Sequence, residues 1–215
     1  MFNKYLRHEK GITGLETAII LIAFVVVAAV FAYTVLSAGL FSTQKGQEAV
    51  YSGLKEAQST LELKGSVIAV AGAIGSTGTI KQVSFVVSSV LGGEAIDFTE
   101  PSAASDNSGL ADTGSNNKVV INYIDQDQNI KNLFWTVTKM GNDDGDNLLE
   151  VNEKFQVTVG GDNVTNPTAG DLLDALSTAL TVNKTFDLEV VAPAGAVLVV
   201  ERTTPAYIDT IMNLH

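Results

Sequence analysis

The chain has no cysteine, and only two histidines occur among its 215 residues. Without cysteine, neither a disulfide nor a thiolate metal site can form, so packing alone must hold the folded state. The two histidines, His8 and His215, lie near the two ends of the sequence. Ser-His-Asp, Cys-His and multi-histidine zinc chemistry all need a histidine within the folded body, so we expect no enzyme.

Positive charge is also scarce. The chain has 13 Lys and Arg against 24 Asp and Glu, which gives a formal net charge of −11. A nucleic-acid binder needs clustered cations for its phosphate contacts, and no broad basic patch is present, so we expect no nucleic-acid partner. The apolar content of 46% is ample for a buried core.

A long uncharged run lies near the amino terminus, from Thr17 to Gln44. About 20 apolar residues are enough to cross the ~30 Å hydrocarbon core of a bilayer. The cations before the run outnumber the single Lys45 that first follows it; they are Lys4, Arg7 and Lys10. The positive-inside rule therefore keeps the amino end in the cytoplasm and exports the rest of the chain.

Helical spacing continues beyond the apolar run. Leu54, Ala57 and Leu61 return to one helix face, and Lys64-Gly65 is a typical helix end, with a cation in the last turn and a glycine for the cap. The spacing predicts one helix from about Thr13 to Lys64. We expect three parts: residues 1–11 as a leader, 12–64 as the helix and 65–215 as an outer domain.

After Gly65 the sequence consists of short β-branched runs separated by turn residues. Clean alternation, as in Phe186, Leu188 and Val190, is typical of strands that bury one face. We predict strands over 66–74, 79–90, 118–125, 133–140, 153–160, 185–192 and 196–203. A polar loop is expected over 102–117, and 171–180 could form a short helix or an irregular crossover. The fold class is α+β: a long hydrophobic helix followed by an immunoglobulin-like antiparallel β-sandwich.

The apolar amino terminus has three interpretations. A cleaved secretory signal needs an apolar core of about 7 to 15 residues, which is shorter than this one. A plain membrane anchor fits the length but does not explain Glu16, because an acid beside a membrane segment is costly unless it is partnered. Cleavage after Gly11 would instead remove the basic prefix, expose the amine of Ile12 and keep the whole helix, as in a class III signal.

Two parts of the sequence resemble the archaellins, the filament subunits of the archaeal motility organelle. The first is EKGITGLETAIILIAFVVVAAVFAYTVLSAGLFSTQKGQEAVYSGLKEAQSTLELKGSV at the amino end. The second comprises NDDGDNLLEVNEKFQVTV and FDLEVVAPAGAVLVVERTTPAYID in the carboxyl half. The resemblance is weakest between residues 92 and 117.

The resemblance implies an extracellular structural subunit that requires no cofactor and polymerises with copies of itself, alone or in a mixed filament with other archaellins. A precursor in the cytoplasmic membrane would be cut between Gly11 and Ile12 by a prepilin-type signal peptidase. Gly14 and Glu16 would serve assembly, with Glu16 neutralising the new amine of Ile12. The partners would be the archaellum membrane platform and its motor. A pilus-like adhesive subunit is the alternative, and an anchored enzyme or solute-binding domain is a third.

A helix that is apolar on all sides is stable only in lipid or among other helices. Small residues such as Ala28 and Ala32 allow close approach, while larger side chains fill the gaps. We expect the following residues to pack in the filament core: Ile19, Leu21, Phe24, Val27, Phe31 and Leu36.

Two kinds of secondary site are expected in the outer domain. A run of oxygen ligands from Asn142 to Glu153 could form an irregular Ca²⁺ or Mg²⁺ loop, although it does not match an EF-hand. The ligands that we expect from this run are Asn142, Asp143, Asp144, Asp146 and Glu150. Glycosylation sequons begin at Asn163 and Asn183. The glycines of GAIGSTGTIK lack a Gly-Lys-Ser/Thr ending and predict a hairpin turn.

Overall fold

A computed structural model of the chain describes residues 9–90, 94–161 and 169–214, without the side chains of residues 9–13 and 58. The chain divides into two units, Met1–Ser52 and Gly53–His215. The described part of the first unit is entirely helix α1. The second unit contains the end of α1 and the β-sheets.

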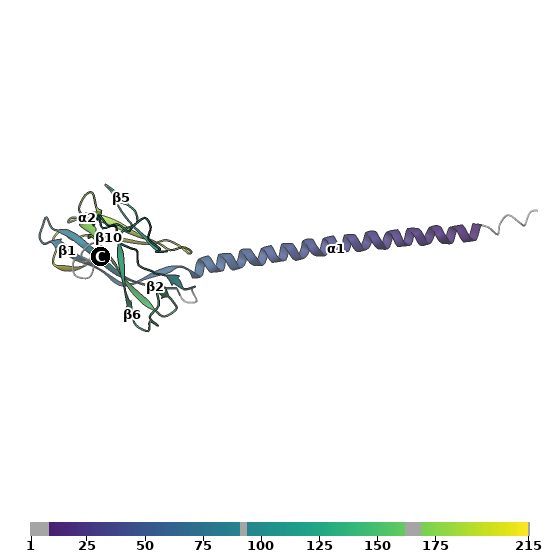
Figure 1. The fold of residues 1–215 in the computed structure, drawn as a ribbon, viewed down its shortest axis with the longest axis horizontal. Helices are drawn as coiled ribbons and strands as arrows, with labels where there is room; N and C mark the ends of the chain where they lie inside the picture. The colour runs from purple at the N-terminus through teal and green to yellow at the C-terminus, as the bar shows by residue number, and fades with distance from the viewer. Residues whose placement is uncertain (1–8, 91–93, 162–168, 215) are drawn as a thin grey trace, which may run out of the picture. The chain divides into compact units, whose positions relative to one another are not determined.

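Helix α1 runs from Glu9 to Gln58, a length of 50 residues, and is drawn from purple to blue in Figure 1. At 1.5 Å per residue it is roughly 75 Å long. No proline interrupts it, so each interior N–H can bond within the helix. Threonine hydroxyls bond back to the helix as well: Thr34 Oγ1 donates to the Phe31 carbonyl at 2.8 Å. The segment thus satisfies its own polar groups, as a lipid-embedded helix must.

The helix ends at Gln58, six residues before the expected end at Lys64. The Ser59 N–H still donates to the Lys55 carbonyl at 3.0 Å, and the chain then becomes extended. Leu61 begins strand β1 because its side chain enters the core and its backbone pairs opposite Ser89. Gly65, expected as the helix cap, lies within β1 at a φ of +78°, next to an irregularity in the strand register.

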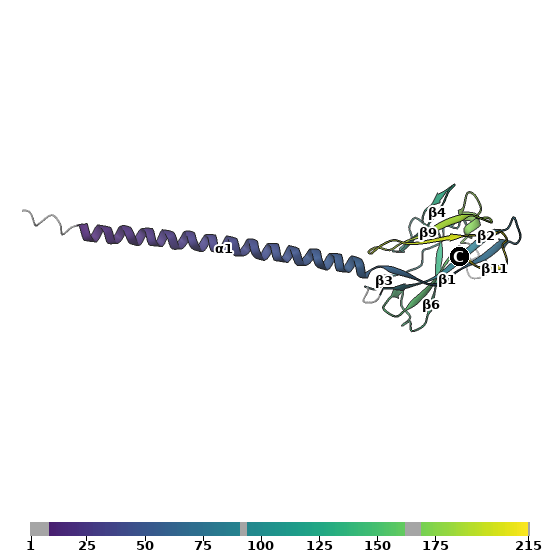
Figure 2. The same cartoon turned by 180° about the vertical axis from the view of Figure 1, so that it is seen from behind.

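The second unit contains a five-stranded and a four-stranded antiparallel sheet, seen from two sides in Figures 1 and 2. The five-stranded sheet has the order β11 (Ile211–Leu214), β1 (Leu61–Ala73), β2 (Thr79–Ser89), β8 (Lys154–Val159) and β6 (Trp135–Met140). The four-stranded sheet has the order β10 (Leu198–Thr203), β9 (Thr185–Val191), β4 (Val120–Asp125) and β5 (Asn129–Ile130). The expected α+β class, with a long helix before antiparallel sheets, is confirmed.

The core is built from the alternate residues that each sheet buries. Phe186, Leu188 and Val190 of β9 are all buried, as their alternation predicts. On the five-stranded sheet, Trp135 and Phe155 both pack edge-on against Phe98, with ring centroids 5.9 and 5.8 Å apart respectively. Aromatic pairs in this arrangement add to the stability that burial of their area provides.

Several short elements were not expected from the sequence. Strands β3 (Ile96–Asp97) and β7 (Leu148–Leu149) pair with each other, while β5 and β11 extend the two main sheets. The segment 171–180 combines both expected alternatives: one helical turn, α2 (Leu172–Ala175), with Asp171 in a capping box, and an irregular stretch after it. The loop over 102–117 is tied down by isolated bridges, including one between Leu110 and Leu133.

Candidate functional site

The surface of α1 is exposed on all sides, and it carries no charged residue between Thr17 and Gln44. Between residues 14 and 57, the described side chains of the helix are all exposed. The six predicted packing residues share this exposure, at 59 to 72%: Ile19, Leu21, Phe24, Val27, Phe31 and Leu36. The segment Gly14–Ala57 is long and apolar enough to cross a membrane. An exposed apolar surface of this extent is unfavourable in water, so α1 requires lipid or other chains around it.

The residues expected to serve processing and assembly lie at the start of α1. Gly11 and Ile12 belong to its helical backbone, although their side chains lie outside the described residues. A Cβ added at Gly14 would meet nothing within 4 Å in this chain. Glu16 is exposed, and it lies four residues after Ile12. Residues four apart share a helix face, so this acid lies on the same side of α1 as the expected new amino end.

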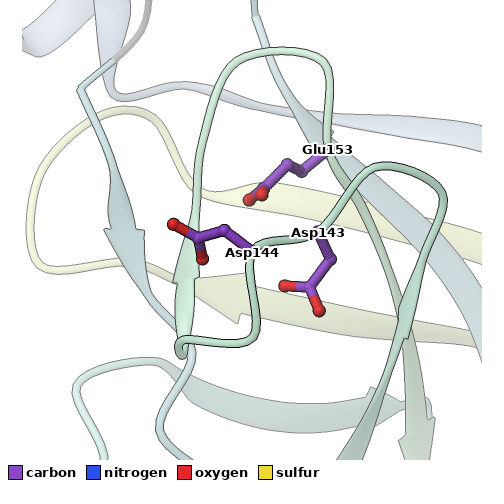
Figure 3. Close-up of side chains that lie close together, drawn as sticks. All are labelled: Asp143, Asp144 and Glu153. Carbon is purple, nitrogen blue, oxygen red and sulfur yellow. The ribbon is translucent and has the colours of Figure 1, made fainter.

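Three acids come together in the second unit (Figure 3). Carboxylate oxygens of Asp143, Asp144 and Glu153 lie within 4.8 Å of one another. Asp143 and Asp144 lie in the loop between β6 and β7, and Glu153 directly precedes β8. Of the acids expected from the sequence, Asp146 and Glu150 are not in this group. Asn142 is exposed in the same loop as Asp143 and Asp144.

The environment of these acids fits a hard divalent cation. Glu153 is only 6% exposed, and its Oε2 accepts the Glu150 N–H at 2.9 Å. Asp143 Oδ1 is buried and accepts no hydrogen bond from the described residues. Three carboxylates at this spacing repel one another, and Ca²⁺ or Mg²⁺ takes oxygen ligands. Asp146 is engaged elsewhere, since its Oδ1 accepts the Leu148 N–H at 2.7 Å.

The two sequons differ in what the structure says of them. Asn163 lies outside the described residues. Asn183 is exposed, at a left-handed φ of +53°, in the turn that precedes β9. Thr185, the third residue of this sequon, is also exposed, and its Oγ1 lies 2.9 Å from Thr203 Oγ1. The Asn183 side chain is therefore accessible to a modifying enzyme.

A second acidic turn, at the end of β4, is structural. Burial alone would raise the pKa of Asp125, but hydrogen bonds from Gln128, Asp127 and Tyr123 outweigh it and hold the pKa below its usual value. Two of these bonds come from backbone N–H groups, of Asp127 at 2.7 Å and of Gln128 at 2.8 Å. The Tyr123 hydroxyl donates to Asp125 Oδ2 at 2.8 Å, and burial raises the pKa of Tyr123 well above its usual range. This carboxylate holds the turn together as an acceptor.

A bare apolar helix at the amino end and an antiparallel β-domain after it define a type IV pilin-like architecture. The family model for archaeal-type flagellin matches residues 11–202. The chain belongs to this archaeal-type flagellin family. The match begins at Gly11, where the expected leader ends.

Individual relatives agree with the family model. Probable flagellin 1 of Archaeoglobus fulgidus is 37% identical to this chain, over 98% of each sequence. Probable flagellin 2 of the same organism is 38% identical, over 94% of this chain and 93% of its own length. Among solved structures, the archaeal flagellum of Methanospirillum hungatei strain JF1 matches with a TM-score of 0.61 and 28% identity, over 94% of this chain and 98% of that one.

Proposed function

We propose that this chain is a filament subunit of the archaeal flagellum, the archaellum, with α1 in the filament core and the β-domain as the outer wall. The exposed apolar surface of α1, in a chain of this family, is the observation that carries the proposal. The filament is a passive structural polymer, and a separate membrane motor rotates it. The flagellin relatives favour this role over the adhesive pilus considered as an alternative.

The subunit uses α1 in two environments. As a precursor it anchors the chain in the cytoplasmic membrane, with the β-domain outside the cell. It then leaves the lipid for a core of sister helices, which is possible only because those helices replace the acyl chains around it. Small residues such as Ala28 and Ala32 let neighbouring backbones approach, and Phe24 and Phe31 fill the remaining space. Contacts between unlike surfaces then extend the assembly as an open helical filament.

A prepilin-type signal peptidase cuts the precursor between Gly11 and Ile12 before assembly. The cut removes the basic prefix, which would hold the amino end at the cytoplasmic face of the membrane. It also creates a positive amine at Ile12, which must be neutralised when the helix end is buried. Glu16 supplies the matching carboxylate, on a neighbouring subunit.

Amino-terminal sequencing of filaments sheared from cells tests the processing step. We expect the sequence to begin at Ile12. A start at Met1, or at Gly39 after cleavage of a conventional secretory signal at Ser37-Ala38-Gly39, would contradict the processing and the filament role together. A strain that lacks the gene should lose its filaments and its swimming. Swimming that persists while surface attachment fails would favour the adhesive alternative.

Glu16 is tested by Glu16→Gln, with Glu56→Gln as the matched control on the same helix. We expect both variants to be processed like the unsubstituted chain. Filament yield should fall at least about tenfold for Glu16→Gln alone, because an unpaired buried charge costs several kcal/mol. Normal filament yield from Glu16→Gln would reduce this acid to a favourable charge at a helix start.

The proposal also includes a glycan and a bound cation on the outer domain. Asn183 carries a glycan, for which its exposure and turn position give access. The intact mass of filament subunits should exceed the polypeptide mass, and Asn183→Gln should lower it by one glycan.

A structural Ca²⁺ or Mg²⁺ binds to the carboxylates of Asp143, Asp144 and Glu153 and relieves the repulsion among them.

A further inference from the structure

The outward side of the five-stranded sheet is nearly free of charge. Strand registers place one uncharged row across all five strands: Asn213, Ile68, Ser84, Thr158 and Thr136. This row is on the outward side because the alternate residues beside it, such as Val83 and Val157, are buried in the core. We call this side of strands β11, β1, β2, β8 and β6 the neutral face.

The rows beside the central one continue the pattern. On one side of the central row, three uncharged residues follow one another across β2, β8 and β6: Val86, Gln156 and Thr138. On the other side of this row, and on the same face, Ile211 of β11 lies opposite Val70 of β1. Charges gather at one end of the neutral face, where Lys64 pairs with Glu62 at 2.7 Å and Lys154 follows on β8.

The outward side of the four-stranded sheet is acidic by contrast. Asp187 of β9 lies directly opposite Glu201 of β10, and Glu189 lies opposite Val199. Residues 65–215 contain 19 acids and 7 Lys and Arg, a net charge of −12. Two copies of such a domain repel each other wherever acidic surfaces meet. The neutral face avoids this repulsion.

The neutral face also carries an exposed apolar side chain and a depression, both of which are common in contact surfaces. Ile211 is 65% exposed at its β11 edge. A depression of about 90 Å³ lies between β1, β2 and β8, lined in part by Ile68, Ser84, Val86 and Gln156. Protein interfaces are depleted of charge at their centres, and their partners fit into such depressions.

The sheet is protected against joining another sheet through its β6 edge. Glu100 accepts the Val137 N–H of β6 at 2.6 Å, so a carboxylate covers a backbone donor that another strand would need. A loop that covers the edge of a sheet discourages strand addition. A neighbour on this side of the sheet therefore contacts its face rather than the β6 edge.

We propose that the neutral face is the surface on which the outer domain of a second copy of this chain packs in the filament. The inference rests on the proposed function, because only a polymer brings many acidic copies side by side. It assigns the two sheets different roles: the five-stranded sheet contacts neighbouring subunits, and the acidic four-stranded sheet faces the medium.

Single cysteines can test this directly, because the chain has none of its own. Thr138 on the neutral face and Thr203 on β10 are both exposed threonines on edge strands, so they form a matched pair. Strains carrying Thr138→Cys or Thr203→Cys would be treated with a soluble maleimide, as intact filaments and as dissociated subunits. We expect filament assembly to slow labelling of Thr138→Cys at least about tenfold, and to leave labelling of Thr203→Cys unchanged.

Equal labelling of both variants in intact filaments would overturn the inference but leave the proposed function standing. Absence of filaments from the unsubstituted chain would overturn the proposed function itself. Thr138→Glu and Thr203→Glu extend the test to assembly, with melting of the dissociated subunits as a check of folding. A folded Thr138→Glu that polymerises as well as Thr203→Glu would also overturn the inference.

Discussion

Truncating one phenylalanine in each unit should separate the two roles that the fold assigns. Phe24 of α1 is 72% exposed, so it contributes little to the folding of the isolated subunit. Phe155 of β8 is fully buried against Phe98. Phe24→Ala and Phe155→Ala remove the same atoms from opposite environments, and we expect opposite effects on folding and on assembly.

The magnitudes follow from burial. Phe155→Ala leaves a cavity in a packed core, which costs about 3–5 kcal/mol. A domain of this size loses about 2–4 °C of melting temperature per kcal/mol, so its transition should fall by roughly 6–20 °C. Phe24→Ala should leave that transition within about 1 °C, since no described core contact is lost.

Filament assembly, unlike folding, should be weakened by Phe24→Ala. Its loss is one of packing rather than of hydrophobic burial, because lipid and the filament core are both apolar. A lost contact of about 1–3 kcal/mol per subunit lowers the assembly equilibrium by roughly one to two orders of magnitude.

Calorimetry of detergent-solubilised subunits would measure folding, and sedimentation of filaments from culture medium would measure assembly. A lowered melting transition in Phe24→Ala would mean that Phe24 stabilises the isolated subunit. Normal filament yield from the same variant would mean that the apolar surface of α1 is not the polymer core. Either result would refute the division of roles.

Three further predictions concern the β-domain. Asp125→Asn should lower the free energy of unfolding at pH 7. The pKa of Asp125 is held below its unfolded value of about 4, so the difference in this free energy between the variant and the unsubstituted chain should shrink as the pH falls below about 4. Urea unfolding at pH 7 and pH 3 measures this, and an equal difference at both would contradict it. Gly170→Ala should destabilise the domain by more than ~2 kcal/mol in the same assay. The reason is that Gly170 has a φ of +71°, and a Cβ there would lie 2.2 Å from the Asn107 carbonyl oxygen. Gly114→Ala is the control and should be neutral, because a Cβ at Gly114 would meet nothing within 4 Å. Titration calorimetry of chelator-treated protein should show Ca²⁺ binding that Asp143→Asn weakens at least about tenfold, and absence of heat from the unsubstituted chain would remove the cation site.

Sequence alone predicts the elements whose own pattern is strong. The uncharged run after Glu16 specifies a helix that needs lipid or helices around it, and the alternation of Phe186, Leu188 and Val190 specifies a strand with one buried face. These patterns depend only on neighbouring residues, so a single sequence contains them in full.

Elements that depend on distant partners could not be predicted in this way. Residues 59–64 have helical spacing, but pairing of β1 with β2 makes them extended, which moves the helix end from Lys64 to Gln58. Strand β3 exists because Ile96 pairs with Leu149, more than 50 residues later. Tertiary pairing overrides local propensity in both places.

The candidate sites show the same division. The exposed packing residues of α1 follow from the apolar run itself. The oxygen ligands were expected over 142–153, and the fold brings Asp143, Asp144 and Glu153 together while it leaves Asp146 and Glu150 out of the group. The proposed assembly role of Glu16 has no signature in charge pattern alone, since it also depends on the proposed cleavage after Gly11.

Helical reconstruction of purified filaments by electron cryomicroscopy tests the proposed role of α1 most directly. We expect a core of α1 helices that start at Ile12, each surrounded by sister helices, with the β-domains outside them. Filaments of this chain that lack a helical core, or whose subunits begin after the apolar segment, would contradict the proposal that α1 is the polymerisation element.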